Sequence, residues 1–333
     1  MHLEDIVKTL SDPAVYPEAT SRVEIIQTQM SIVFLTDKQA YKIKKAVNLG
    51  YLDYTTLENR KRFCEQEVIL NQRLCGDVYL DVVPISVEKG KIILGGKGKT
   101  IEYAVKMRRL PADRTMDVML IKNQVTPEMI TQLAEKVAGF HSKAETSPDI
   151  SRFGTIATIT FNCEENFSQT ESYIGRTISR EQFQRISKYT RDFLNQNVFL
   201  FNKRVSDGRI KDCHGDLHAQ HVCFTNGICI YDCIEFNDRF RYVDVAAEVS
   251  FLAMDLDRWG YSELSQQFVN AYVTKSGDRE LPKLLNFYKC YFAYVRGKVG
   301  GFKLDAPLVS GDEKVRALQE ARQYFTLAEG YTK

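Results

Sequence analysis

The stretch His214-Gly215-Asp216-Leu217-His218-Ala219-Gln220-His221 is the most informative part of this 333-residue sequence. Three of the five histidines lie in these eight positions, and a second aspartate, Asp232, follows a short apolar run at 228–231. Phosphoryl transfer from a nucleotide needs one carboxylate that orients the attacking hydroxyl and others that hold magnesium on the phosphates. Magnesium prefers oxygen ligands, which suits Asp232. The stretch therefore predicts a phosphoryl-transfer site.

The chain before position 110 reads mainly as strands. Six short runs rich in β-branched and aromatic residues predict strands at 23–27, 32–36, 40–45, 82–87, 91–94 and 101–107. Between the third and fourth runs, apolar residues recur at helical spacing from Leu57 to Cys75, after a capping-box pattern at Thr55 and Glu58. Lys42 and Glu67 on these elements could supply the cation that stabilises the nonreacting phosphates and the carboxylate that positions it.

The chain after position 110 reads mainly as helices. Helical periodicity and start signals predict helices at about 127–141, 179–203, 243–259, 262–274, 282–299 and 313–329. We therefore expect a small β-rich lobe over residues 1–110, with an N-terminal helix and one further helix. A larger helical lobe over 111–333 would hold a catalytic loop at 214–221 and a metal segment at 230–238.

Composition excludes several other classes of protein. Lys+Arg 45 against Asp+Glu 43 gives a net charge of +2, which does not support a nucleic-acid or membrane-surface role. The sequence has no apolar run long enough for a membrane span, and MHLEDIVKTL does not resemble a signal peptide, so we expect a cytoplasmic protein. The eight cysteines include no CxxC pair and are expected to be buried reduced thiols. The sequence does not predict an oligomeric state.

The motifs HGDLHAQH (214–221) and YDCIEF (231–236) resemble the aminoglycoside phosphotransferase / choline kinase branch of the protein-kinase-like fold. The resemblance spans about 23–299. It is closest to a bacterial subgroup that shows segments like VFLTDKQAYKIKK (33–45), EVILNQRL (67–74) and YAVKMRRLP (103–111). It implies an α+β, bilobal fold and a small-molecule kinase. Such an enzyme would transfer the γ-phosphoryl group of ATP or GTP to a hydroxyl, with Mg²⁺ as cofactor.

The resemblance also implies roles for single residues. Asp216 would be the catalytic base, in a loop organised by His214, and Asp232 would be the main magnesium ligand. Lys42 would bind the α- and β-phosphates with Glu67 as its helix partner. Lys44 points to the same face of the strand, so the choice between the two lysines stays open.

The remaining nucleotide contacts are implied less directly. The nucleotide base is expected to contact backbone groups of 106–110, which assigns Met107 and Arg109 to the cofactor site. The hairpin 28–31 is expected to face the phosphates, with Ser31 as the hydrogen-bond donor. His221 stands where the family usually has Asn, and imidazole is a softer ligand than an amide oxygen. His221 could bind the metal indirectly, bind a different divalent ion, or only hold the loop.

The sequence does not identify the acceptor of the phosphoryl group. His218, Glu235 and Asp238 are candidate substrate contacts. Seven acids against three arginines in 228–260 suit a cationic acceptor, but they equally suit a solvated helix face. Asp244 and Glu248 likewise fit either an exposed face or a contact to the catalytic-loop backbone, and His141 fits a core histidine.

Two other functions fit part of the pattern. His214, Asp216, His218 and His221 could hold zinc in a metal-dependent hydrolase. That hypothesis leaves Asp232 and the whole first lobe unexplained. A nucleotide-binding pseudokinase is the other alternative, supported only by His221 in place of Asn.

Overall fold

The computed structural model describes residues 3–306 and 309–333, which form two compact units. The first unit consists of residues up to Val118 together with Gln220–Asp238, and the second consists of Met119–Ala219 and Arg239–Lys333. The sequence pattern places the boundary at 110. The structure assigns residues 111–118 and 220–238 to the first unit, because Cys223 and Cys229 share an apolar core with residues such as Val68.

The first unit is built on an antiparallel sheet of six strands in the order β1-β2-β3-β6-β4-β5. The strands are β1 (Glu24–Gln27), β2 (Ser31–Leu35), β3 (Gln39–Lys44), β4 (Tyr79–Glu88), β5 (Lys91–Leu94) and β6 (Lys99–Arg108). All six predicted strands are present, with ends shifted by at most three residues. A separate hairpin joins β8 (Val222–Phe224) to β9 (Ile228–Ile230).

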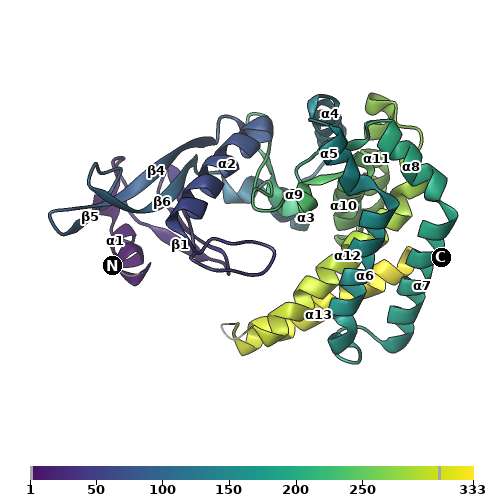
Figure 1. The fold of residues 1–333 in the computed structure, drawn as a ribbon. Coiled ribbons are helices and arrows are strands. Elements are labelled where there is room, and N and C mark those ends of the chain that lie inside the picture. The colour runs from purple at the N-terminus through teal and green to yellow at the C-terminus, as the bar shows by residue number, and fades with distance from the viewer. Residues whose placement is uncertain (1–2, 307–308) are drawn as a thin grey trace. The chain divides into compact units, whose positions relative to one another are not determined.

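One helix covers each face of the six-stranded sheet (Figure 1). On one face, α1 (Leu3–Leu10) and the short η1 (Pro13–Val15) pack near Tyr41 and Ile43 of β3. On the other face, α2 (Leu57–Cys75) packs near Ala40. Because side chains alternate along a strand, Lys42 and Lys44 point toward α2, as the sequence pattern predicts.

The N-terminus of α2 differs from the prediction by one residue. Thr56 is the N-cap, and its hydroxyl accepts a hydrogen bond from Asn59 N. The predicted capping box at Thr55 and Glu58 is wrong, because the Thr55 hydroxyl donates to Asp53 Oδ1 instead. Both residues carry a hydroxyl, so composition alone could not choose between them.

The expectation of reduced thiols is wrong for two cysteines. Cys75, at the end of α2, and Cys229, on β9, form a disulfide with their Cα atoms 4.7 Å apart. The two residues lie 154 positions apart in the sequence, and both are buried. The other six cysteines are buried and form no disulfide within the described residues.

The second unit is mainly helical (Figure 1). Its helices, with the connecting α3, are α3 (Met116–Ile121), α4 (Pro127–Lys143), α5 (Pro148–Ser151), α6 (Ile156–Thr170), α7 (Arg180–Gln196), α8 (Val198–Ser206), α9 (Asp238–Arg241), α10 (Val245–Arg258), α11 (Ser262–Ser276), α12 (Leu281–Asp305) and α13 (Gly311–Gly330). Its short 3₁₀ turns are η3 (Arg152–Gly154) and η4 (Glu171–Tyr173), whereas η2 (Ala112–Arg114) belongs to the first unit and η5 (Ala219–His221) lies where the chain passes back into it. A two-stranded ladder pairs β7 (Ile210–Asp212) with β10 (Tyr242–Asp244).

Helix α10 is the core of the second unit, since every residue from Val245 to Leu256 is buried. The predicted helix at 179–203 is in fact two helices that meet at Asn197, and α6 has no counterpart among the predicted helices. None of the described helices is long and apolar enough to cross a membrane.

Candidate active site

The loop that carries Asp216 is fixed at both ends by carboxylates of α10. Glu248 Oε1 accepts hydrogen bonds from His214 N and Gly215 N, each at 2.7 Å. Asp255 Oδ2 accepts one from Ala219 N at 2.8 Å. Positions 248 and 255 lie two helical turns apart on one face of α10. The buried helix therefore sets the position of the loop.

A buried chain of hydrogen bonds holds Glu248 in turn. Its Oε2 lies 2.7 Å from His141 Nε2, and His141 Nδ1 lies 2.8 Å from the Tyr272 hydroxyl. Burial alone would raise the pKa of Glu248, but the hydrogen bonds and charge of its partners outweigh burial and lower it. His141 is thus a core histidine, as predicted, and Glu248 is the loop contact. The exposed-face interpretation is wrong also for Asp244, which pairs with buried Arg204.

The loop presents Asp216 and buries His214. The Asp216 side chain is 32% exposed, and His218 Nε2 lies 3.5 Å from its Oδ2. His214 is fully buried, and its Nδ1 accepts a hydrogen bond from Asp216 N at 3.3 Å. The His214 ring therefore shapes the loop backbone from inside the protein, while Asp216 is accessible.

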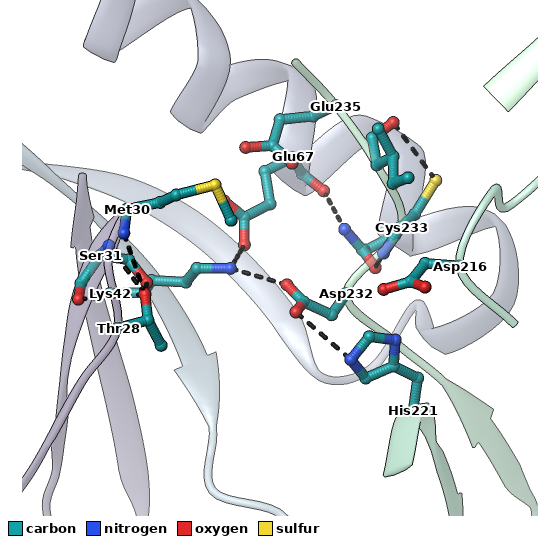
Figure 2. Close-up of polar contacts among 12 residues, drawn as sticks. Thr28, Met30, Ser31, Lys42, Glu67, Asp216, His221, Asp232, Cys233 and Glu235 are labelled. Carbon is teal, nitrogen blue, oxygen red and sulfur yellow. Dashed lines mark hydrogen bonds and ion pairs between the residues drawn. The ribbon is translucent and has the colours of Figure 1, made fainter. Parts of the chain in front are cut away.

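A chain of alternating charges runs through the first unit. Lys42 Nζ lies 2.7 Å from Asp232 Oδ1 and 2.8 Å from Glu67 Oε1 (Figure 2). The other oxygen of Glu67 lies 2.6 Å from Lys44 Nζ, and Lys44 also pairs with Glu235. The Tyr54 hydroxyl donates to Glu235 at 2.6 Å. Glu67, on α2, thus holds both lysines of β3.

Burial distinguishes the two lysines. The side chain of Lys44 is 1% exposed and lies between two carboxylates, whereas the side chain of Lys42 is 16% exposed and reaches Asp232. Desolvation alone would lower the pKa of each lysine, but the neighbouring carboxylates outweigh it and raise both. Burial also opposes the charge of Glu67, but both lysines lower its pKa. Both lysines are therefore charged, and Lys42 is the accessible one.

The two lysines of the network are shared among three carboxylates. Glu67, Asp232 and Glu235 each form an ion pair with Lys42 or Lys44. The Asp232 side chain is the most exposed carboxylate, at 41%, and its Oδ2 lies 3.6 Å from His221 Nε2 (Figure 2). A carboxylate and an imidazole are both groups that bind divalent cations in proteins.

The backbone at Asp232 is held in an unusual conformation. Its φ of +62° lies in the left-handed region, which is costly for a residue other than glycine. Asp232 N donates to the Tyr79 hydroxyl at 3.1 Å, and Cys233 N donates to Asn71 Oδ1 at 2.9 Å. Non-glycine residues in this region concentrate at functional sites, because the surrounding structure must stabilise them.

Other predicted site residues have structural partners. Glu235 is 5% exposed and bonded within the network, and Met107 is part of the apolar core. The guanidinium of Arg109 donates to Thr36 O at 2.8 Å and to Glu24 Oε2 at 3.1 Å. The Ser31 hydroxyl is buried and lies 3.0 Å from Thr28 Oγ1, inside the hairpin turn. Asp238 begins α9.

The acids of 228–260 are largely neutralised within their own units. The acids that accept hydrogen bonds or form ion pairs with protein groups include Asp232, Glu235, Asp244, Glu248, Asp255 and Asp257. The solvated-face interpretation therefore fails for most of them. The cluster also gives no specific support to a cationic acceptor.

Sequence comparison finds relatives of unassigned function. No family model matches the chain. Uncharacterised proteins of Mycobacterium tuberculosis and Mycobacterium bovis are 30% identical over 278 residues, which is 83% of this chain and 54% of theirs. The chain thus spans about half the length of these curated relatives.

Structure comparison shows the fold. A choline/ethanolamine kinase family protein from Mesorhizobium loti has a TM-score of 0.54, with 12% identity and 98% of both chains covered. The GDP complex of aminoglycoside 2'-phosphotransferase-IIIa has a TM-score of 0.51, with 13% identity and 97% and 98% of the two chains covered. Plasmodium vivax ethanolamine kinase has 0.50, with 10% identity and 92% and 81% covered. These neighbours confirm the predicted α+β kinase-like fold and match the family that the sequence resembles.

Proposed function

We propose that this chain is a small-molecule kinase that transfers the γ-phosphoryl group of ATP or GTP to a hydroxyl of a small acceptor. The observation that carries the proposal is Lys42, which bridges buried Glu67 and accessible Asp232. In nucleotide-dependent kinases, a lysine paired with a helix glutamate binds the phosphates, and an aspartate holds the divalent cation. The fold neighbours are phosphotransferases by name, and one of them was solved with GDP.

The nucleotide base would bind to the backbone at 108–110. Arg108 N donates to Val78 O at 2.8 Å, and Arg109 N donates to Lys38 O at 2.9 Å. Leu110 N has no acceptor among the described residues, so it is available to a ring nitrogen of the base. Met107 and Arg109 would then shape this part of the site without donating side-chain hydrogen bonds to the base.

The phosphates would lie between Lys42 and the hairpin 28–31. Thr28 Oγ1 accepts hydrogen bonds from Met30 N and Ser31 N, at 3.2 and 3.0 Å, and this closes the turn. Gln29 N, at the exposed tip, has no acceptor in the described part of the chain. The amide of Gln29 is therefore a better candidate phosphate donor than the Ser31 hydroxyl, which is already bonded within the turn.

Asp232 and His221 would hold the divalent cation. The carboxylate supplies a hard oxygen ligand, whereas the imidazole favours Mn²⁺ over Mg²⁺ or a water-bridged contact. When bound, the cation would neutralise developing charge on the phosphate oxygens.

Asp216 would orient the acceptor hydroxyl and take its proton. The acceptor oxygen forms a bond to the γ-phosphorus as the bond from that phosphorus to the β-phosphate bridging oxygen breaks, so no covalent enzyme intermediate forms. Glu248 and Asp255 keep the loop of Asp216 fixed during this step, since both belong to the buried helix α10.

The test is nucleotide turnover by the purified chain with a panel of hydroxyl-bearing metabolites, with Mg²⁺ and with Mn²⁺. We expect acceptor-dependent release of nucleoside diphosphate and an acceptor that gains one phosphoryl group by mass spectrometry. Stoichiometric zinc in the purified protein, together with no nucleotide binding, would instead support the hydrolase alternative.

A further inference from the structure

We propose that a cavity on the first unit binds a small organic anion, with an apolar body and a phosphate or carboxylate group. The cavity has a volume of about 520 Å³ and lies beside Arg108–Pro111. Its other walls come from the turn between α2 and β4, at Asp77 and Val78, and from the turn between β8 and β9. A volume of this size suits a small metabolite.

This cavity is distinct from the proposed phosphate and metal site. The described residues that line the cavity do not include Lys42, Glu67 or Asp232 of the charge network, and they do not include His221. The cavity shares only the chain segment 108–110 with the proposed binding site of the nucleotide base. The proposed ligand is therefore neither the phosphates nor the metal of the kinase reaction.

The walls offer both apolar surface and cationic donors. Val78, Leu110, Pro111 and Phe224 supply the apolar part. Three arginines, Arg108, Arg109 and Arg114, also line the cavity, and Asp77 is the single acid among the described lining residues. This excess of positive charge favours an anion over a neutral or cationic ligand.

Two of the arginines retain donors for a ligand. Arg109 is held by Glu24 and by Thr36 O. Arg108 Nη1 and Asp77 Oδ2 are 3.7 Å apart, with side chains 61% and 79% exposed, so their ion pair is weak. Arg114 Nε donates to Phe224 O at 2.9 Å, and no carboxylate within the described residues forms an ion pair with it. Arg108 and Arg114 are therefore the groups expected to bind the anion.

A ligand in this cavity would touch three segments that carry parts of the proposed kinase site. The turn at Asp77 follows α2, which carries Glu67, and the turn at Thr225 leads through β9 to Asp232. The third segment contains Leu110. If the proposed function holds, we expect the anion to change nucleotide affinity, whereas binding of the anion itself does not depend on that function.

The test is isothermal titration calorimetry with 1-naphthyl phosphate, which combines an aromatic body with a phosphate. We expect wild-type protein to bind 1-naphthyl phosphate. It should bind 1-naphthol and inorganic phosphate at least about tenfold more weakly, because 1-naphthol lacks the anionic group and inorganic phosphate lacks the apolar body. The double variant Arg108→Gln/Arg114→Gln should weaken binding of 1-naphthyl phosphate by about tenfold or more. The control Arg180→Gln, at an exposed position of the second unit, should not change it.

A second variant separates the cavity from the nucleotide site. Lys42→Met should keep the wild-type affinity for 1-naphthyl phosphate. Absence of binding, equal affinity in the double arginine variant, or loss of binding in Lys42→Met alone would each overturn the proposal. These outcomes are independent of nucleotide turnover, so failure of the proposed kinase function would be recognised separately.

Discussion

Two lysines two positions apart on one strand differ in burial, and we propose that they differ in role for that reason. Lys42 and Lys44 both contact Glu67, so spacing and charge alone could not separate them. Lys44 lies in a closed environment with Glu235 and Tyr54, whereas Lys42 reaches the accessible Asp232. We therefore assign nucleotide binding to Lys42 and stabilisation of the fold to Lys44.

Lys42→Met and Lys44→Met form a matched pair that tests this assignment. Lys44→Met should lower the free energy of unfolding by about 3–5 kcal/mol, because it leaves buried carboxylates without a cation. Lys42→Met should change stability much less and abolish measurable nucleotide binding. Urea unfolding and nucleotide titration of both variants check the prediction. Unchanged nucleotide affinity in Lys42→Met would show that the assignment is wrong.

His221 departs from the pattern of the family that the sequence resembles, and its variant tests the proposed metal site. The imidazole lies 3.6 Å from Asp232 and is a softer ligand than an amide. His221→Asn should therefore shift the ratio of activity with Mg²⁺ to activity with Mn²⁺ toward Mg²⁺, by about tenfold. The measurement is initial rate against the concentration of each metal. An identical ratio in variant and wild type would place His221 outside the metal site.

At the scale of elements, the loop that carries Asp216 is attached to α10, and we expect the proposed catalysis to depend on that attachment. Glu248→Gln keeps the shape of the side chain but removes its charge, and we expect turnover to fall by about 10- to 100-fold through misplacement of Asp216. A fall in kcat at unchanged nucleotide affinity would identify a positioning role. A variant with wild-type kcat would contradict it.

The lowered pKa of Glu248 predicts that the stability of the protein depends on pH. The pKa of Glu248 is lowered from 4.5 in the folded protein, so its stabilising contribution is present above that value and is lost as pH falls through the folded pKa. Wild-type protein should therefore lose stability below about pH 4.5 more steeply than Glu248→Gln. Urea unfolding between about pH 6 and pH 3 measures the difference in slope. Equal slopes would contradict the lowered pKa.

The disulfide between Cys75 and Cys229 ties the end of α2 to β9. Replacement of both by serine should lower the free energy of unfolding by about 2–4 kcal/mol, because the cross-link restricts the unfolded chain. Reductant should lower the free energy of unfolding of the wild type to a similar degree and leave that of the variant unchanged. Eight titratable thiols in the untreated, denatured protein would contradict the disulfide.

Elements were predictable where local chemistry determines them, and less so where distant contacts do. Runs of β-branched and aromatic residues predicted all six strands of the sheet, and Thr126 and Ser179 marked true helix starts. The break at Asn197 lies in a continuous helical pattern and left no local signal. The disulfide joins residues 154 positions apart, and such a pairing has no local signature.

The residues of the candidate site were likewise predictable from local motifs, but their distant partners were not. The sequence motifs indicate Asp216, Asp232, Lys42 and Glu67 as candidates. The partners that hold them are distant in sequence. The two backbone donors to Glu248, at His214 and Gly215, precede it by 34 and 33 positions. Only the folded chain shows that Glu235 belongs to the lysine network and that Tyr79 supports Asp232.

For the whole molecule, the two units divide the proposed chemistry between them. The first unit carries Lys42, Glu67, His221 and Asp232, and the second carries Asp216 and its support on α10. The segment 220–238 belongs to the first unit although it follows the catalytic loop directly in the sequence. The proposed base and the proposed metal ligand are thus close in sequence but belong to different units.

The most direct test of the kinase proposal is transfer of radiolabelled γ-phosphate to an acceptor by wild-type protein and by Asp216→Asn. We predict that the wild type transfers label with a divalent cation present, and that the variant loses about 10²- to 10⁴-fold in rate while it keeps nucleotide affinity and fold. Equal transfer by the two proteins, or no transfer by the wild type across the acceptor panel despite tight nucleotide binding, would contradict the account.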